Sequence, residues 1–243
     1  MYVPIFCSLV MMSTNIGMSK MMIQGVGVFR RFRPQRGNNK ELSSQIHDFV
    51  INIAAMSSAP PRRATMVYSR REVVLVEEWS HAEKYSVYEE TEQNGQRLAG
   101  KVQQFLSEPP TVEYFPEALH IYQGQDHHDT NNKADIGILV RQKTNSPQNG
   151  AQLRDAQKEA YERQMKFEPR CTCCIILAGS SLDTSQVRII ELWKTMQDFD
   201  FHESSEWHDL GEEKVVPLVI DMDCDFVEGK RIIISDGDCT KTS

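Results

Sequence analysis

The sequence lacks the motifs that mark several well-known classes of enzyme and membrane protein. It has no glycine-rich phosphate-binding loop, no GxGxxG dinucleotide motif and no nucleophile elbow. Its mostly apolar N-terminal run, residues 1–12, is shorter than the about 20 residues that span a bilayer. The sequence therefore gives no evidence for a nucleotide-dependent enzyme, a serine hydrolase or a transmembrane protein.

Basic residues are too few for a nucleic-acid partner. The chain has 27 Lys and Arg against 34 Asp and Glu, a net charge of −7, whereas binding to phosphates requires a basic face. One local exception is Arg30-Arg31-Phe32-Arg33, but alternate strand residues point to opposite faces and so divide this cluster. We interpret it as the solvated end of a strand and expect no nucleic-acid partner.

Cysteines are few and do not form a disulfide framework. Three of the six lie in Cys171-Thr-Cys-Cys174, beside an apolar run, and no second cysteine pair has zinc-site spacing. No Asn-x-Ser/Thr acceptor is present, and the uncharged first 19 residues lack the basic start of a signal peptide. We therefore expect a cytoplasmic protein without a membrane partner. Methionines between residues 11 and 22 suggest that its true start lies downstream.

What the sequence does contain is an internal repeat. The segment Val73–Trp79 resembles Val187–Trp193, and an aromatic residue follows each tryptophan six positions later. A repeat of this length predicts a duplicated unit. The other matched positions are Glu77 with Glu191, Glu89 with Glu203, Glu92 with Glu206, and Val26-Gly-Val28 with Ile136-Gly-Ile138.

Each copy has the expected element order β-α-β-β-α-β. In the first copy the periodicity predicts strands at 22–32, 64–68, 72–79 and 111–115, a helix at 42–54 and helical residues from 80 to 106. In the second copy it predicts strands at 136–141, 171–178, 186–193 and 231–234, and a helix at 152–165. The last helical region, 196–219, is expected to be interrupted by Gly211 and Pro217.

The repeat divides the chain into five parts. We expect a flexible N-terminal segment (1–21), a first ferredoxin-like repeat (22–116), a polar linker (117–133), a second repeat (134–236) and a C-terminal tail (237–243). A four-stranded sheet with helices on one face leaves its other face apolar, and Val73–Trp79 is apolar on both faces for much of its length. The predicted fold class is therefore α+β, with two ferredoxin-like repeats packed sheet to sheet.

This repeat resembles the antibiotic-biosynthesis-monooxygenase family of dimeric α+β barrels, here as a tandem duplication. The resemblance implies an intramolecular barrel with a pocket between each sheet and its helices. The family includes cofactor-independent oxygenases of aromatic polyketides, haem-degrading monooxygenases, small-molecule isomerases and proteins without known activity. The matching residues are Glu77, Trp79, Tyr85 and Tyr88 in the first copy, and Glu191, Trp193, Phe199 and His202 in the second.

The motif of the haem-degrading branch is missing. That branch has an Asn on its first strand, a Trp nine residues after the strand-three Trp, and a His ten residues further on. Here the Trp position holds Tyr88 or His202, the His position holds Leu98 or Glu212, and the Asn is missing. His208 does lie near the relevant helix of the second copy, and a haem-binding or haem-degrading protein is kept as the second alternative.

His202 and Tyr88 are the candidate catalytic residues. His202 and Glu206 are four residues apart, so on one helical face the carboxylate can orient the imidazole or raise its pKa. The same spacing is typical of a solvated pair on a helix surface. The candidate substrate-binding residues are Trp79, Tyr85, Trp193, Phe199, Glu206 and His208, of which the aromatic ones are also typical of a protein core.

We expect no bound metal or cofactor. His202 and Glu206 have no obvious third ligand in the sequence, and His127-His128 lies in the polar linker, where we interpret it as exposed.

The sequence favours a small-molecule-binding barrel whose partner is an apolar or aromatic molecule. A cofactor-independent activity of the monooxygenase or isomerase type is the first hypothesis, and a non-enzymatic binding or interaction module is the alternative. An enzyme should have a cavity of roughly 300 Å³ or more reached by His202 or Tyr88. The copies differ at these positions, so at most one pocket is expected to be active. We expect a monomer with an internal pseudo-dimer, or a dimer of it.

Overall fold

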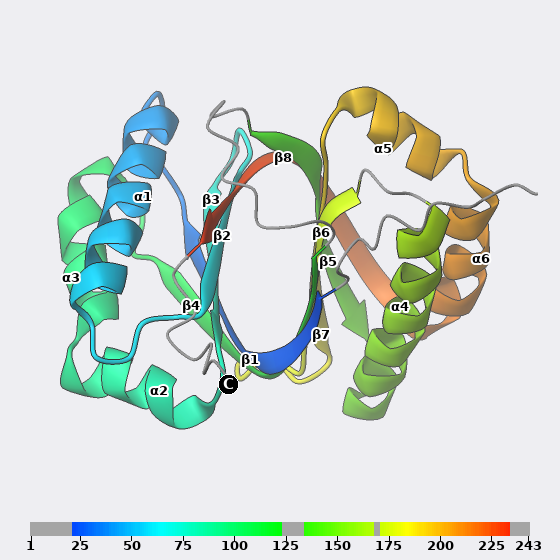
Figure 1. The fold of residues 1–243 in the computed structure, drawn as a ribbon, viewed down its shortest axis with the longest axis horizontal. Coiled ribbons are helices and arrows are strands. Elements are labelled where there is room, and N and C mark those ends of the chain that lie inside the picture. The colour runs from blue at the N-terminus through cyan, green and yellow to red at the C-terminus, as the bar shows by residue number, and fades with distance from the viewer. Residues whose placement is uncertain (1–20, 123–133, 168–170, 234–243) are drawn as a thin grey trace, which may run out of the picture.

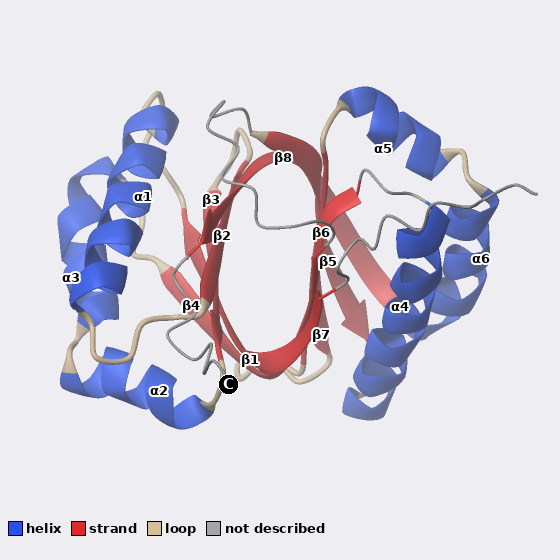
Figure 2. Cartoon of the chain, viewed as in Figure 1, coloured by secondary structure: helices blue, strands red, loops and turns tan. Residues whose placement is uncertain are grey.

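The computed structural model describes residues 21–122, 134–167 and 171–233. These residues form a closed eight-stranded barrel in which every neighbouring pair of strands is antiparallel. Helices lie outside the barrel in two groups, and Figure 2 shows the ring of strands between them. This confirms the predicted α+β fold, in which the two repeats close one barrel within a single chain.

The first unit, residues 21–122, is called the N-terminal half. Its strands are β1 (Met21–Phe32), β2 (Arg63–Tyr68), β3 (Val73–Trp79) and β4 (Thr111–Tyr122). Its helices are α1 (Asn39–Met56), α2 (Ala82–Ser86), a π-helical turn at Val87–Thr91, α3 (Asn94–Val102) and a 3-10 turn at Gln103–Phe105. Helix α1 packs on the sheet through one apolar stripe: Leu42, Ile46, Phe49, Val50 and Ile53.

The second unit, residues 134–233, is called the C-terminal half. Its strands are β5 (Asp135–Thr144), β6 (Cys171–Ala178), β7 (Gln186–Trp193) and β8 (Val219–Ile233). Its helices are α4 (Pro147–Phe167), α5 (Met196–Glu203), α6 (Glu206–Val215) and a 3-10 turn at Val216–Leu218.

The barrel is closed by two equivalent seams between the halves. The strand order around the ring is β1-β3-β2-β8-β5-β7-β6-β4, so each half has the same internal order. The seams are β2 with β8 and β4 with β6. Helices α1 to α3 cover one side of the barrel and α4 to α6 cover the opposite side (Figure 1).

The strand register shows that the two copies match residue by residue. Since β1 pairs with β3 as β5 pairs with β7, positions on the first strand of each half can be aligned. The matched cross-strand pairs are Val26–Trp79 with Ile136–Trp193, Val28–Glu77 with Ile138–Glu191, and Arg30–Leu75 with Val140–Ile189. The repeat found in the sequence is therefore a repeat of structure.

Buried apolar residues form three clusters, one inside the barrel and one under each group of helices. Strand β3 serves two of them, because Val74 and Val76 face the barrel interior while Val73 and Leu75 face the helices. Side chains from both halves fill the interior. The space for a ligand therefore lies between a sheet and its helices.

Two expectations for the second copy are wrong. Gly211 does not interrupt the helical region, since it lies inside α6; the break lies at Ser204-Ser205 instead. The last strand begins at Val219, well before residue 231. Its acidic residues hid the apolar alternation in the sequence, and Arg141 of β5 pairs with two of them, Asp223 at 3.1 Å and Asp225 at 3.0 Å.

The end of β4 also differs from the expected boundary at residue 116. The strand runs to Tyr122 and so takes up the beginning of the predicted linker. The rest of that linker, including His127-His128, lies outside the described residues, as do residues 1–20 and 234–243.

Candidate functional site

Four pairs of equivalent residues occupy the space between sheet and helices. Glu77 and Glu191 lie on the third strand of each half, and Arg30 and Val140 lie on the first strand. The helical segments after the tryptophans supply Tyr88 with Glu89 in one half and His202 with Glu203 in the other. The two halves therefore have glutamates at equivalent positions, but the residues around those glutamates differ.

In the N-terminal half a buried arginine joins the two glutamates. Arg30 Nε lies 2.6 Å from Glu77 Oε2, and Arg30 Nη2 lies 2.7 Å from Glu89 Oε2. Tyr88 donates a hydrogen bond of 3.3 Å to the other oxygen of Glu77. Burial by itself lowers the pKa of Arg30, but the two carboxylates outweigh burial and raise it above its ordinary value. The expectation that Arg30 belongs to a solvated strand end is wrong, because Arg30 is 3% exposed.

The aromatic residues of this half are core residues. Trp79 makes edge contacts with Tyr85 and Tyr88 at ring-centroid distances of 5.1 and 5.3 Å. Tyr88 is buried, and burial together with the Glu77 carboxylate raises the pKa of its phenol. This phenol therefore stays protonated at neutral pH. A cavity of about 180 Å³ lies beside Arg30 and Glu89 and is also lined by Phe32, Leu98 and Val112.

In the C-terminal half Val140 stands at the position of Arg30, and a larger cavity is open beside it. Its volume is about 240 Å³, somewhat less than the roughly 300 Å³ expected of an enzyme pocket. It lies between the sheet and helices α4, α5 and α6, and His202 reaches it. Its apolar lining includes Ile138, Val140, Ile189, Val215 and Met222, and its ionisable lining includes Glu191, His202, Glu203, His208, Glu212 and Cys224.

Glu191 and His202 form the buried polar end of this cavity. Their side chains are each 6% exposed, and His202 Nε2 lies 3.7 Å from Glu191 Oε2. Burial raises the pKa of Glu191 to about 7, a change that His202 opposes and Glu203 reinforces. Glu191 Oε2 accepts no hydrogen bond from the described part of the chain. This carboxylate can therefore interact with a group that enters the cavity.

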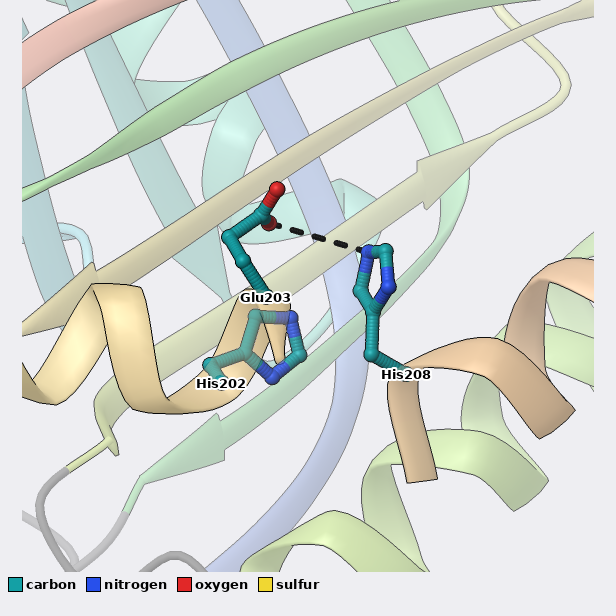
Figure 3. A group of neighbouring side chains, drawn as sticks. All are labelled: His202, Glu203 and His208. Carbon is teal, nitrogen blue, oxygen red and sulfur yellow. Dashed lines mark ion pairs between the residues drawn. The ribbon is translucent and has the colours of Figure 1, made fainter. Parts of the chain in front are cut away.

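Two helix caps bring His202, Glu203 and His208 together. Thr195 caps α5 by accepting a hydrogen bond from the Asp198 amide, and Ser205 caps α6 by accepting one from the His208 amide. The tight turn between the helices places Glu203, the last residue of α5, 3.6 Å from His208 Nε2 (Figure 3). One ligand atom from each of the three side chains lies within 4.8 Å of the others.

The structure separates the other predicted site residues from this cavity. His202 and Glu206 lie on different helices, so the expectation that they share one helical face is wrong; the carboxylate beside His202 is that of Glu191. Glu206 is exposed on α6 and does not line the cavity. Trp193 and Phe199 are buried against one another at 5.1 Å in the core. Of the predicted residues, His202 and His208 line the cavity.

The sequence alone did not identify the residues that make the two cavities different, which are the buried glutamates and their neighbours on the first strand. It matched Glu191 to Glu77 but assigned no role to either residue beyond the resemblance. The contrast between Arg30 and Val140 was also present in the aligned repeat. A residue-by-residue comparison of the two copies would have found that one buried glutamate lacks the arginine that the other has.

The fold and the cavity define the class of the protein: a single-chain α+β barrel in which two ferredoxin-like halves replace the two protomers of a dimeric barrel. No helix in the described ranges combines the length and apolar character needed to cross a bilayer. No protein-family model matches the chain, and no curated protein sequence matches it.

Solved structures do match nearly the whole chain. A "putative monooxygenase" from Fusobacterium nucleatum has a TM-score of 0.68 at 10% identity, covering 86% of this chain and 94% of the other. A second "putative monooxygenase", from Lactobacillus acidophilus, has a TM-score of 0.68 at 9% identity, covering 88% and 98%. An "anthrone oxidase-like protein" has a TM-score of 0.61 at 11% identity, covering 89% and 98%. At this identity the likeness shows the tandem fold alone.

Proposed function

We propose that the C-terminal half binds a small, largely apolar molecule and holds its hydroxyl or carbonyl group against Glu191 and His202. One observation carries this proposal. Val140 lies at the position equivalent to Arg30, so the buried carboxylate of Glu191 has no such arginine beside it and faces a cavity. The lining of that cavity combines aliphatic side chains with polar ones, among which Glu191 and His202 are neighbours. This is the division of roles that a ligand with an apolar body and one polar group requires.

The cavity volume sets the size of the molecule. An apolar cavity of about 150 Å³ holds benzene. A cavity of about 240 Å³ accordingly suits a molecule of one or two rings. Haem is much larger than this, so the cavity does not favour the haem-binding alternative. Since each half covers the sheet of the other, the barrel needs no second copy of the chain to be complete.

Glu191 and His202 give this site a means of moving a proton. A carboxylate beside a bound phenol, or beside a carbon next to a carbonyl group, can accept the proton that such a group releases. Return of the proton to another atom is an isomerisation. Oxidation of the resulting anion by molecular oxygen, with the substrate supplying the electrons, is an oxygenase-type or oxidase-type reaction. One neighbour in fold is named for anthrone oxidase, whose name refers to a substrate of this chemical kind.

Calorimetric titration with 1-naphthol tests the binding step. We expect one molecule to bind per chain, and we expect Glu191→Gln and His202→Ala to weaken binding at least about tenfold, because each removes a polar contact that is worth about 1.4 kcal/mol or more. Glu206→Gln, on the exposed face of α6, should leave affinity unchanged. Absence of 1-naphthol binding, or equal binding by all four proteins, would contradict the proposal.

Oxygen uptake with 1,4-naphthohydroquinone separates the enzyme from the binding module. In this reaction the quinol loses two electrons and two protons to oxygen, which gives the quinone and hydrogen peroxide. An enzyme should raise the rate above the spontaneous one and should lose that gain in Glu191→Gln. Naphthol binding without such a gain would favour the non-enzymatic alternative.

A further inference from the structure

Two imidazoles and a carboxylate that line the C-terminal cavity converge on one another. Figure 3 shows His202 and Glu203 projecting from the end of α5 and His208 from the beginning of α6. Two ligands of one tetrahedral ion, each about 2.0–2.2 Å from it, are about 3.4 Å apart. The 3.6 Å between Glu203 Oε1 and His208 Nε2 is close to that value. The His202 ring lies 4.9 Å from the His208 ring, between centroids.

In the N-terminal half a cationic side chain lies between the two glutamates of this site. There the guanidinium of Arg30 contacts both Glu77 and Glu89. The equivalent residues in the C-terminal half are Glu191 and Glu203, and Val140 supplies no charge. The C-terminal half therefore has carboxylates at both positions and lacks the side chain that neutralises them in the N-terminal half.

The described lining of the cavity has carboxylates but no lysine or arginine to pair with them. Three carboxylates line it (Glu191, Glu203 and Glu212), and none of its described lining residues is Lys or Arg. Glu191 is buried, and its Oε2 accepts no hydrogen bond from the described residues.

We propose that His202, Glu203 and His208 bind a divalent first-row transition-metal ion in the space that corresponds to the guanidinium of Arg30, and that Glu191 supports His202 from within the cavity. Two imidazoles and one carboxylate favour Zn²⁺ or Fe²⁺ over Mg²⁺ or Ca²⁺, which prefer oxygen ligands alone. Three protein ligands leave a coordination position open for water or for a ligand. This inference goes beyond the proposed function, since it concerns an ion that would bind even without an organic molecule.

Titration of the full-length chain with Zn²⁺ alone tests the site. His127 and His128 lie outside the described residues and offer competing ligands, so the reference protein should carry His127→Ala and His128→Ala. After removal of metals with EDTA and removal of the chelator, we expect about one Zn²⁺ per chain by calorimetry. Co²⁺ should give visible absorption bands that Zn²⁺ abolishes, which reports nitrogen and oxygen ligation directly.

Variants of the three ligands identify the site. In the reference protein, His202→Ala and His208→Ala should each weaken Zn²⁺ binding more than about 100-fold, since loss of a supporting residue alone costs about 10–100-fold. Glu203→Gln should do the same and should remove the Co²⁺ bands. The matched controls are Glu206→Gln, on the same helix pair, and His47→Ala, a histidine of the N-terminal half; both should bind Zn²⁺ like the reference protein.

Either of two results would overturn the proposal. The first is that the reference protein takes up no stoichiometric Zn²⁺ while circular dichroism shows that it is folded. The second is that it binds Zn²⁺ equally well without His202 and His208. Binding of 1-naphthol in the presence of EDTA is measured separately, so a failed metal site and a failed small-molecule site give different results.

Discussion

The two halves of this barrel share strand order, register and glutamates, and they differ in the residue that stands between those glutamates. In the N-terminal half Arg30 joins Glu77 to Glu89 and Tyr88 caps the network, so the polar groups satisfy one another. In the C-terminal half Val140 leaves Glu191 and His202 facing a cavity. When the buried polar groups all pair with one another, none is left to interact with a ligand. When a partner is missing among the described residues, as beside Glu191, a buried group remains that a ligand can pair with. This difference is the reason why we propose that the C-terminal half binds a ligand and that the N-terminal half serves as a scaffold.

The largest expected effect is a loss of stability when Arg30 is changed to valine, the residue at the equivalent position in the C-terminal half. Arg30→Val leaves Glu77, which is 0% exposed, without its charged partner, and removal of one member of a buried pair costs about 3–5 kcal/mol. Urea denaturation at pH 7 measures this loss. Arg33→Val is the control, because Arg33 and its partner Glu108 are both exposed and such pairs contribute at most about 1 kcal/mol.

A second substitution separates burial of charge from loss of packing at Arg30. The double variant Arg30→Val with Glu77→Gln buries no charge and should recover part of the lost stability. If Arg30→Val costs less than about 1 kcal/mol, the view of the N-terminal half as a closed network is wrong.

The reverse exchange should close the C-terminal cavity. In Val140→Arg the guanidinium should lie between Glu191 and Glu203, and affinity for both 1-naphthol and Zn²⁺ should fall by more than about 100-fold, or about 2.7 kcal/mol. Val140→Leu fills volume without adding charge, so it should weaken 1-naphthol and leave Zn²⁺ binding in place. Retention of both ligands by Val140→Arg, measured by calorimetry, would contradict the equivalence of the two positions.

The two residues predicted to be catalytic should behave differently. Tyr88→Phe removes one hydrogen bond to Glu77 and should cost about 1 kcal/mol of stability without changing affinity for 1-naphthol. His202→Phe keeps an aromatic ring at the equivalent position and should lower that affinity about tenfold. An equal loss of affinity in both variants would show that the N-terminal half also takes part in binding.

The smallest effect concerns the third pair of matched glutamates. Glu92 accepts hydrogen bonds from Ser57 at 2.5 Å, from the Ser58 hydroxyl at 2.7 Å and from Asn94 at 2.7 Å, and so joins the end of α1 to α3. Burial by itself raises the pKa of Glu92, but these hydrogen bonds outweigh burial and lower it to about 2. Glu206, its counterpart, is exposed on α6.

Because the folded-state pKa of Glu92 lies below the ordinary value of 4.5, its contribution to stability is complete above that pH and is lost as the pH falls toward 2. Glu92→Gln should therefore cost about 1 kcal/mol at pH 7 and less at pH 3, in urea denaturation at both pH values. Glu206→Gln should stay within about 0.5 kcal/mol at either pH. An equal cost of Glu92→Gln at both pH values would mean that Glu92 is not acting as a carboxylate acceptor.

Much of the fold could be predicted because its signals are local. The stripe from Leu42 to Ile53 predicts α1, and the two-faced apolar run Val73–Trp79 predicts a strand covered on both sides. The duplication predicts two units of one kind. The last strand was expected to begin too far along the chain, because the acidic residues Asp223 and Asp225 are more typical of a loop than of a strand. Arg141, which is distant in the sequence, pairs with both of them in the sheet.

The candidate site was predictable only in part. His202 and His208 were expected near a pocket and do line the cavity. Glu206 was expected beside His202 on one helix, but Ser205 caps a new helix and the two residues lie on different helices. Tyr88 was expected to be a catalytic residue, yet its hydroxyl donates a hydrogen bond to Glu77. Spacing along a helix shows which residues can meet, and it does not show what the opposite strand contributes.

The sequence by itself determined that this protein is a duplicated β-α-β-β-α-β unit, since periodicity and repeat spacing are properties of neighbouring residues. Only the tertiary structure decided which half has a buried carboxylate facing its cavity. The difference depends on contacts between the first strand, the third strand and the helical segment that follows the third strand. Arg30 is 47 positions from Glu77 and 59 positions from Glu89 in the sequence. Whether a buried carboxylate is already neutralised or still available is set by such long-range contacts, which no local pattern records.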